Sequence, residues 1–190
     1  GVVDSLNQYE SLPKNNAFTF CVASRLVADK GIGEVITAFN KLSKDHPESK
    51  LVLMGDGPES DTFKHQAKKN NHIHFIGHQT DPLSYIAMSD VFIHPTYHEG
   101  FSVALVEASM LARPIVATAV GGNLEIIYAD KTGILIPSKD SESLYIAMDK
   151  LISDKDLRKK LGGNARKQYI DRFNFETIVQ KQFIPIYEEK

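Results

Sequence analysis

The sequence contains a single cysteine, so no disulfide can form within the chain. Cys21 lies in the apolar run Phe18-Thr19-Phe20-Cys21-Val22-Ala23. A thiol in such a run is typical of a buried strand and of core filling rather than of a nucleophile. An unpaired thiol also favours a reducing compartment. No apolar run is long enough to cross a bilayer and no signal peptide opens the chain, so we expect a cytoplasmic protein.

The chain has no excess of positive charge. Its 22 lysines and arginines are balanced by 24 acidic residues, giving a net charge of -2 and a pI near 6.4. A general nucleic-acid binder needs a basic face to neutralise phosphates, so nucleic acid is not expected as a partner. With 190 residues and 42% hydrophobic residues, the composition is that of an ordinary globular domain with one sizeable core.

Several familiar motifs are missing. No G-K-[ST] occurs, which excludes a P-loop, and no G-x-S-x-G occurs, which excludes an acyl-transfer elbow. Gly55-Asp56-Gly57 and Gly31-Ile32-Gly33 both fail to complete G-x-G-x-x-G, because Ser60 and Ile36 occupy the third glycine position. These absences remove the commonest dinucleotide and nucleoside triphosphate sites.

Metal binding is not expected either. The seven histidines follow no recognised ligand spacing. Asp154-Lys155-Asp156 has an Asp-x-Asp pattern that can hold a divalent ion, but it directly precedes a predicted helix. Acidic residues there cap N–H groups and favour the helix dipole, so we interpret Asp154 as a cap and predict no metal and no organic cofactor.

What the sequence does contain is a regular alternation of short apolar runs and helical patterns. The predicted strands are Ala17–Ala23, Lys50–Met54, His72–Ile76, Asp90–Ile93, Ile115–Thr118 and Gly133–Ile136. The predicted helices are Ile32 to before Pro47, Glu59 to about Asn70, Pro82–Met88, Ser102–Ala112, a short one ending at Tyr128, Ser141–Ser153, Asp154–Arg172 and Phe175–Glu189. This alternation predicts an α/β fold with a doubly wound, Rossmann-like parallel sheet of six strands in the order 3-2-1-4-5-6.

The most informative stretch joins the fourth strand to the following helix. It reads His94-Pro95-Thr96-Tyr97-His98-Glu99-Gly100-Phe101-Ser102-Val103-Ala104-Leu105-Val106-Glu107. The helix that begins there is apolar on nearly every face, and Glu107 is its one charge. A buried carboxylate needs hydrogen-bond donors from a protein group or from the hydroxyls of a ligand. Gly100 permits close approach, and the free N–H groups of Gly100, Phe101, Ser102 and Val103 favour an anion.

Two acids separated by seven residues across a Gly-Phe helix start resemble the E-x7-E signature of retaining GT-B glycosyltransferases of the group 1 (GT4) family. The resemblance implies that Glu107 holds the ribose hydroxyls of a nucleotide sugar and that Glu99 lies against the hydroxyls of the donor sugar. It implies too that the helix start cradles the diphosphate. The pattern Ser24-Arg25-Leu26, three residues, Lys30-Gly31 is similar to the family's cation pair. Arg25 and Lys30 are therefore expected to offset the charge of the leaving diphosphate.

Other residues at the strand ends are assigned more weakly. The Gly-x-Gly-Pro turn beginning at Gly55 resembles one that the family places beside the nucleotide, but a tight turn that starts a helix explains it equally. Gly77, His78 and Leu83 are expected to edge the base. His94 and His98 lie near the site and are candidates to touch phosphate or sugar. Gly121-Gly122-Asn123 resembles a glycine loop lining the cleft, and a plain turn with an Asn cap is the alternative.

The resemblance covers about residue 18 to the C-terminus and corresponds only to the donor-binding half of such an enzyme. We expect residues 1–16 to be a linker, 17–172 the nucleotide-sugar-binding domain and 173–190 a helix crossing to the missing N-terminal acceptor domain. The intact enzyme would transfer a sugar from a UDP-, GDP- or ADP-sugar to a hydroxyl of a saccharide or lipid-linked acceptor. The chain alone would be inactive, and the missing domain would account for any peripheral membrane location.

Two alternatives stay open at this point. One is a non-catalytic doubly wound module that regulates or binds a partner. The other is a different enzyme of related fold, a sugar-nucleotide epimerase or a phosphorylase, although a phosphorylase needs a pyridoxal lysine and a longer chain.

Overall fold

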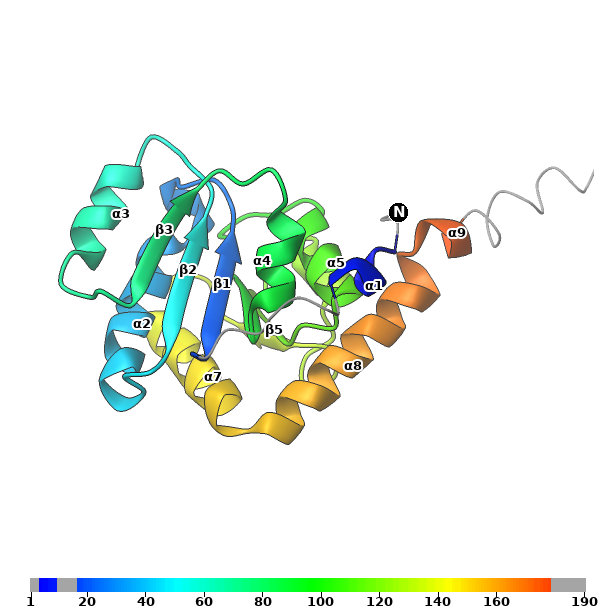
Figure 1. Ribbon diagram of the computed structural model, residues 1–190. Helices are drawn as coiled ribbons and strands as arrows, with labels where there is room; N and C mark the ends of the chain where they lie inside the picture. The colour runs from blue at the N-terminus through cyan, green and yellow to red at the C-terminus, as the bar shows by residue number, and fades with distance from the viewer. Residues whose placement is uncertain (1–3, 10–16, 179–190) are drawn as a thin grey trace, which may run out of the picture.

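The computed structural model describes residues 4–9 and 17–178, which fold around one six-stranded parallel sheet (Figure 1). The strand order β3-β2-β1-β4-β5-β6 confirms the predicted topology. The strands are β1 (Thr19–Ala23), β2 (Lys50–Met54), β3 (Ile73–Gly77), β4 (Val91–His94), β5 (Ile115–Thr118) and β6 (Ile134–Ile136). The helices are α1 (Leu6–Tyr9), η1 (Ala28–Lys30), α2 (Ile32–Asp45), α3 (Ser60–Ala67), α4 (Pro82–Met88), α5 (Val103–Met110), α6 (Asn123–Ile126), α7 (Ser141–Ser153), α8 (Lys155–Arg172) and α9 (Phe175–Ile178).

The strand order reverses between β1 and β4, and this point positions the site. β1 pairs with β2 on one side and with β4 on the other, where Cys21 lies opposite Phe92. The chain therefore leaves the carboxyl ends of β1 and β4 in opposite directions. In open parallel sheets a crevice forms at such a reversal, and ligands bind there.

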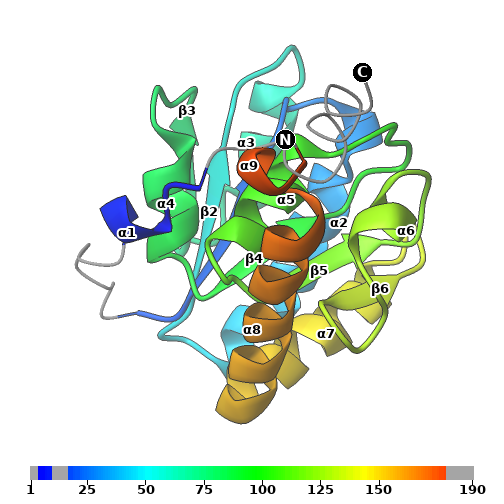
Figure 2. The ribbon, with the colours of Figure 1, turned by 90° about the vertical axis from the view of Figure 1, so that its right-hand side faces the viewer.

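Helices cover both faces of the sheet, because alternate strand residues point to opposite sides. Phe20 and Val22 join a core with α2, α3 and α7, whereas Cys21 joins a second core with α4, α5 and α8. Figure 2 shows α8 lying across α5 on the second face. Cys21 is fully buried and its burial raises the pKa of the thiol to about 12, which confirms its interpretation as core filler.

The N-terminal helix α1 was not expected from the sequence. Its four residues are too few to show a helical period, and tertiary contacts hold it in place. Leu6 and Tyr9 pack against the second core, and Arg166 of α8 donates to Asp4 at 3.0 Å. The segment before β1 therefore contacts the domain at residues 4–9 instead of simply leading into it.

Two expectations concern the C-terminal part. Asp154 is the N-cap of α8 and accepts a hydrogen bond from the Leu157 N–H at 2.8 Å, which confirms its capping role. The predicted helix from Phe175 begins at the expected residue, but beyond Ile178 it lies outside the described residues. None of the helices within residues 4–9 and 17–178 is long and apolar enough to span a membrane.

Candidate functional site

The residues singled out from the sequence surround the carboxyl ends of β1, β2 and β4. A pocket of about 360 Å³ lies over the ends of β1 and β2 and includes Arg25. A second hollow of about 320 Å³ lies between the loop after β4 and the loop after β5, and includes Glu99 and Gly100. The fold thus brings the predicted groups to one edge of the sheet, but it divides them between two neighbouring hollows.

Two side chains bind the same carboxylate oxygen of Glu99. Lys30 Nζ and His94 Nε2 each lie 3.2 Å from Glu99 Oε2. Lys30 is the last residue of η1 and His94 is the last residue of β4, so both come from elements that end at the sheet edge. No protein group in the described part of the chain bonds Oε1, which therefore remains available to a ligand.

The electrostatics of this cluster fix its protonation. Burial alone would raise the pKa of Glu99, but the hydrogen bond and charge of Lys30, with a smaller contribution from His94, hold that pKa below its ordinary value. Burial lowers the pKa of His94, and the opposing charge of Glu99 does not overcome it. Near pH 7 the site therefore contains an ionised Glu99 and a neutral His94. To donate to Glu99, His94 must carry its proton on Nε2, which leaves the buried Nδ1 an acceptor without a partner.

The loop after Glu99 leads into a helix start with free donors. Ser102 caps α5 by accepting a hydrogen bond from the Leu105 N–H at 3.3 Å. Within the described residues, the backbone N–H groups of Gly100 and Phe101 donate to no protein acceptor. A side chain at Gly100 would meet only open space. Phe101 and Val103 are both 53% exposed, and Phe101 stacks edge-on against Phe173 at 6.1 Å. An anion can approach these amides directly.

Glu107 lies one turn further along α5 and is only partly exposed. Its carboxylate forms no hydrogen bond or ion pair with any described residue, and burial raises its pKa above the ordinary value. Of the two ways to satisfy a buried carboxylate, residues 4–9 and 17–178 supply neither a donor nor a cation. The arrangement therefore favours hydroxyl groups of a ligand as the partners of Glu107.

Glycines allow the loops around Glu99 to pack backbone against backbone. Gly121 has φ 43°, and a Cβ there would lie 2.1 Å from the carbonyl oxygen of Glu99. Gly122 donates its N–H to that same carbonyl at 3.0 Å. The suggested Asn cap is wrong, because Gly122 is the N-cap of α6 and the amide of Asn123 instead donates to the Thr118 carbonyl at 3.0 Å. The glycine loop thus packs against the backbone of Glu99 and bonds its carbonyl group.

Of the three residues expected to edge the base, only His78 lines the pocket around Arg25. Arg25, Gly55 and His78 all line it. Gly77 has φ 69° with open space beside its Cα, which suits close approach of a flat group. Leu83 does not line the pocket, because its side chain packs against the second core, and its neighbour Pro82 lines it instead.

Sequence reasoning missed two features of the site. His94 was placed near it, but its hydrogen bond to Glu99 was not foreseen, because nothing in a strand-end histidine reveals where its ring points. Tyr9 donates a hydrogen bond to Asp81, the N-cap of α4, at 3.0 Å. The pKa of Tyr9 is raised mainly by burial, then by Asp81, and to a smaller extent by the charge of Glu107. The only feature of the sequence that could have indicated this contact is that Tyr9 is an aromatic residue in an otherwise polar segment. No group of three or more metal-ligating side chains occurs in residues 4–9 and 17–178.

Comparison with known proteins agrees with this geometry. Residues 5–168 match the family of glycosyl transferases group 1. The N-acetyl-alpha-D-glucosaminyl L-malate synthase of Bacillus anthracis is 34% identical over 83% of this chain and 42% of its own length. The crystal structure of Anabaena Alr3699/HepE in complex with UDP-glucose superposes with a TM-score of 0.80 at 26% identity, covering 92% of this chain and 50% of that one.

A third relative covers the same part of the fold. The C-terminal domain of a glycosyl transferase group 1 family protein (LpcC) from Francisella tularensis superposes with a TM-score of 0.78 at 26% identity, covering 90% of this chain and 93% of that one. The chain spans less than half the length of the curated relatives first matched. It belongs to the glycosyl transferase group 1 family and has the fold of the C-terminal domain of such an enzyme.

Proposed function

We propose that this chain binds a nucleotide diphosphate sugar as the donor half of a retaining glycosyltransferase that transfers a hexosyl group to an acceptor hydroxyl. The observation that carries the proposal is Glu107, a partly buried carboxylate that lies one turn beyond an open helix start and has no partner in the described part of the chain. Two ribose hydroxyls would supply the two donors that this carboxylate lacks. Anabaena Alr3699/HepE was crystallised in complex with UDP and with UDP-glucose, which makes UDP the first nucleotide to test.

The other residues of the site would contact the diphosphate and the base of the donor. The diphosphate would lie on the free amides of Gly100 and Phe101, where the helix dipole favours negative charge. The base would lie in the pocket of about 360 Å³, beside Gly77 and His78. Arg25, which lines that pocket, would face the phosphates from the opposite side. The site would therefore enclose the donor between cations and amides without requiring a metal.

Glu99 would position the transferred sugar. Its Oε2 is fixed by Lys30 and His94, so Oε1 can accept a hydrogen bond from a sugar hydroxyl without rotation of the carboxylate. The same fixation lowers the basicity and the nucleophilicity of Glu99, which argues against a covalent glycosyl intermediate on it. Retention would then arise by displacement on one face, with the leaving phosphate accepting the proton of the acceptor.

Lys30 would interact with the negative charge of the donor diphosphate. Its ammonium group pairs with Glu99, which directly precedes the free amides of Gly100 and Phe101. A bound diphosphate offers a stronger negative charge nearby, and Lys30 can stabilise the additional charge that develops as the sugar leaves. Loss of Lys30 should therefore reduce turnover in the intact enzyme more than it reduces folding.

The chain would need a second domain for catalysis, because the proposed site lies open at one edge of the sheet. That second domain would be the N-terminal acceptor domain, which presents the hydroxyl of a saccharide or lipid-linked acceptor. Isothermal titration of the 190-residue chain with UDP, GDP and ADP tests donor binding. We expect saturable binding of one nucleotide in the micromolar to millimolar range and no sugar transfer. Absence of heat with all three nucleotides would overturn the proposal.

An Arg25 variant separates specific binding from general charge effects. Arg25→Gln should weaken binding of the preferred nucleotide diphosphate about 10–150-fold, since a charge-assisted contact to phosphate contributes about 1.5–3 kcal/mol. The matched control is Arg172→Gln, which removes the same charge from the C-terminal end of α8. Equal weakening in both variants would contradict the proposed role of Arg25.

A further inference from the structure

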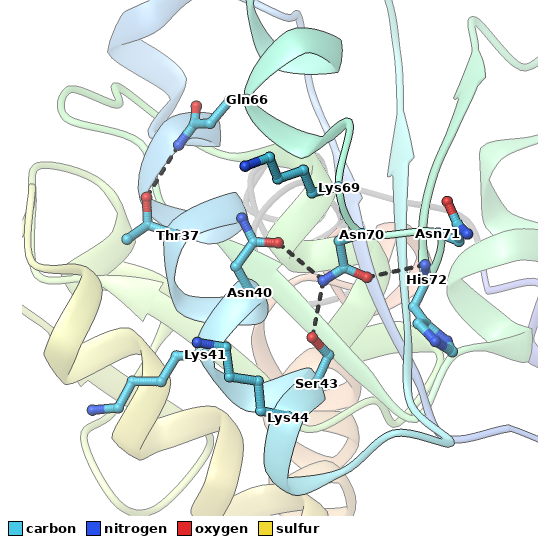
Figure 3. Close-up of a pocket in the computed structure, with 10 residues that line it drawn as sticks. All are labelled: Thr37, Asn40, Lys41, Ser43, Lys44, Gln66, Lys69, Asn70, Asn71 and His72. Carbon is cyan, nitrogen blue, oxygen red and sulfur yellow. Dashed lines mark hydrogen bonds between the residues drawn. The ribbon is translucent and has the colours of Figure 1, made fainter.

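A second concave surface lies away from the candidate donor site. A groove of about 770 Å³ separates the C-terminal halves of α2 and α3 and reaches the start of β3 (Figure 3). The donor-site residues lie at the carboxyl ends of the strands, so this α2/α3 groove is at the opposite edge of the sheet. Its lining residues are Thr37, Asn40, Lys41, Ser43, Lys44, Gln66, Lys69, Asn70, Asn71 and His72.

The floor of the α2/α3 groove is held by a network of side-chain hydrogen bonds. Asn70 donates to Asn40 Oδ1 and to Ser43 Oγ, both at 2.9 Å, and accepts from the His72 N–H at 3.0 Å. Gln66 similarly donates to Thr37 at 3.1 Å. These bonds, drawn in Figure 3, connect α2 to the segment after α3. The groove is thus a fixed feature of the packing between two helices.

The free groups that remain are mainly hydrogen-bond donors. Asn40 uses its carbonyl oxygen to accept from Asn70, while its own amide group has no partner among the described residues. The amide of Asn71 is likewise unengaged. A ligand that satisfies these groups must be rich in acceptors, as hydroxyl, carboxylate and phosphate groups are.

The charge of the α2/α3 groove is entirely positive. Lys41 pairs with Glu142 at 2.7 Å and points toward α7, but Lys44 and Lys69 have no carboxylate partner in the described part of the chain. No acidic residue lines the groove. Lys64 and Lys68 line an adjoining hollow of about 290 Å³ that shares Asn70 and Asn71. This local concentration of lysines contrasts with the chain as a whole, whose net charge is -2.

Helix stabilisation does not account for the whole arrangement. Lys44 lies in the last turn of α2, where a cation favours the helix dipole. Lys69 lies two residues beyond the end of α3, where a cation also favours the dipole of that helix. The dipoles do not, however, require the unengaged amides of Asn40 and Asn71 between the two lysines.

We propose that the α2/α3 groove binds an anionic oligosaccharide. Its carboxylate groups would pair with Lys44 and Lys69, and its ring hydroxyls would bond the amides of Asn40 and Asn71. The volume of about 770 Å³ is within the range of small-molecule sites and suits several sugar rings. A membrane surface fits less well, because a plane cannot enter a concave groove, and none of the exposed large apolar side chains lines it.

Isothermal titration of the 190-residue chain with hexagalacturonate tests the proposal, with maltohexaose as the neutral ligand of similar length. We expect one site for hexagalacturonate that survives saturation with UDP, and at least tenfold weaker binding of maltohexaose. Lys44→Gln/Lys69→Gln should weaken hexagalacturonate about tenfold. Lys159→Gln/Lys160→Gln, which removes two exposed lysines from α8, should leave the affinity within about twofold.

Four results would overturn the proposal. They are absence of hexagalacturonate binding, equal binding of maltohexaose, equal weakening by the two double variants, and displacement of hexagalacturonate by UDP. Sedimentation with phosphatidylglycerol vesicles examines the membrane alternative. Vesicle binding that is lost in Lys44→Gln/Lys69→Gln but kept in Lys159→Gln/Lys160→Gln, with no hexagalacturonate binding, would assign this surface to a membrane instead.

Discussion

Replacing Glu107 by glutamine should make this domain more stable while it destroys the proposed nucleotide site. Glu107 is partly buried on α5 without a partner among the described residues, so its ionised form is disfavoured in the folded chain. A group whose folded pKa is raised contributes stability below its unfolded value near 4.5 and loses that contribution as the pH rises through the folded pKa. Near pH 7 the ionised Glu107 therefore weakens the fold, and an uncharged glutamine of the same size does not.

The size of the effect follows from the burial of one unsatisfied group. Leaving a buried polar group unpaired costs about 1–3 kcal/mol, and partial exposure places Glu107 at the lower end of that range. We expect Glu107→Gln to raise the free energy of unfolding by about 1 kcal/mol near pH 7. For a domain of this length, that change raises the melting temperature by about 2–4 °C. The difference should disappear below about pH 4.5, where Glu107 is protonated as well.

Thermal and urea unfolding across the pH range measure the stability effect, and titration with UDP measures the binding effect. Two hydrogen bonds from ribose hydroxyls to a charged acceptor would be weakened in the variant, so the affinity should fall about 10–100-fold. The matched control is Glu48→Gln, which removes one exposed carboxylate between α2 and β2. A destabilised Glu107→Gln, or one that binds UDP as tightly as the original chain, would refute the reasoning.

Three further changes test the rest of the structure. Lys30→Gln should cost about 1 kcal/mol near pH 7 by urea unfolding, and because Lys30 holds the pKa of Glu99 low, this cost should shrink as the pH falls through that folded pKa. Gly162→Ala should lower the melting temperature, since its Cβ would lie 2.2 Å from the Ala112 carbonyl, whereas Gly163→Ala, which meets nothing within 4 Å, should stabilise α8 by about 0.5–1 kcal/mol. Asp154→Ala should cost about 1 kcal/mol through loss of the cap, with the same melting temperature in the presence and absence of Mn²⁺. A melting temperature of the original chain that rises with Mn²⁺ but does not rise in Asp154→Ala would restore the metal interpretation.

The fold was predictable because its elements are encoded locally. β2, α4, β5 and α7 occupy the predicted residues, since each apolar run is bounded by glycine, proline or a capping acid. The strand order follows from right-handed crossovers once the alternation is known. Helix α1 escaped prediction, because it is held by packing of Leu6 and Tyr9 on the second core and by the bond from Arg166 to the preceding Asp4, which join segments far apart in the chain.

The candidate site was predictable in its residue types but not in its contacts. Glu107 stands out in the sequence as the one charge of an apolar helix, and Glu99 and Lys30 stand out as charges in the loops that follow apolar strands. Their partners do not, since the sequence cannot tell that Lys30 and His94 share one oxygen of Glu99 or that Glu107 has no partner among the residues that the structure describes. Leu83 illustrates the same limit, because rotation of α4 decides whether it or Pro82 faces the pocket.

The sequence by itself determined that the chain forms a parallel α/β sheet with an anion-favouring helix start between two acids. Strand and helix periods, caps and glycine turns are properties of neighbouring residues, and they act before any distant contact forms. Only the tertiary structure decided which charges neutralise each other, leaving Glu107 open while Glu99 is paired, and which lysines gather in the α2/α3 groove. Such pairings depend on distances of a few ångströms between segments far apart in the chain, and packing of the helices on the sheet sets those distances.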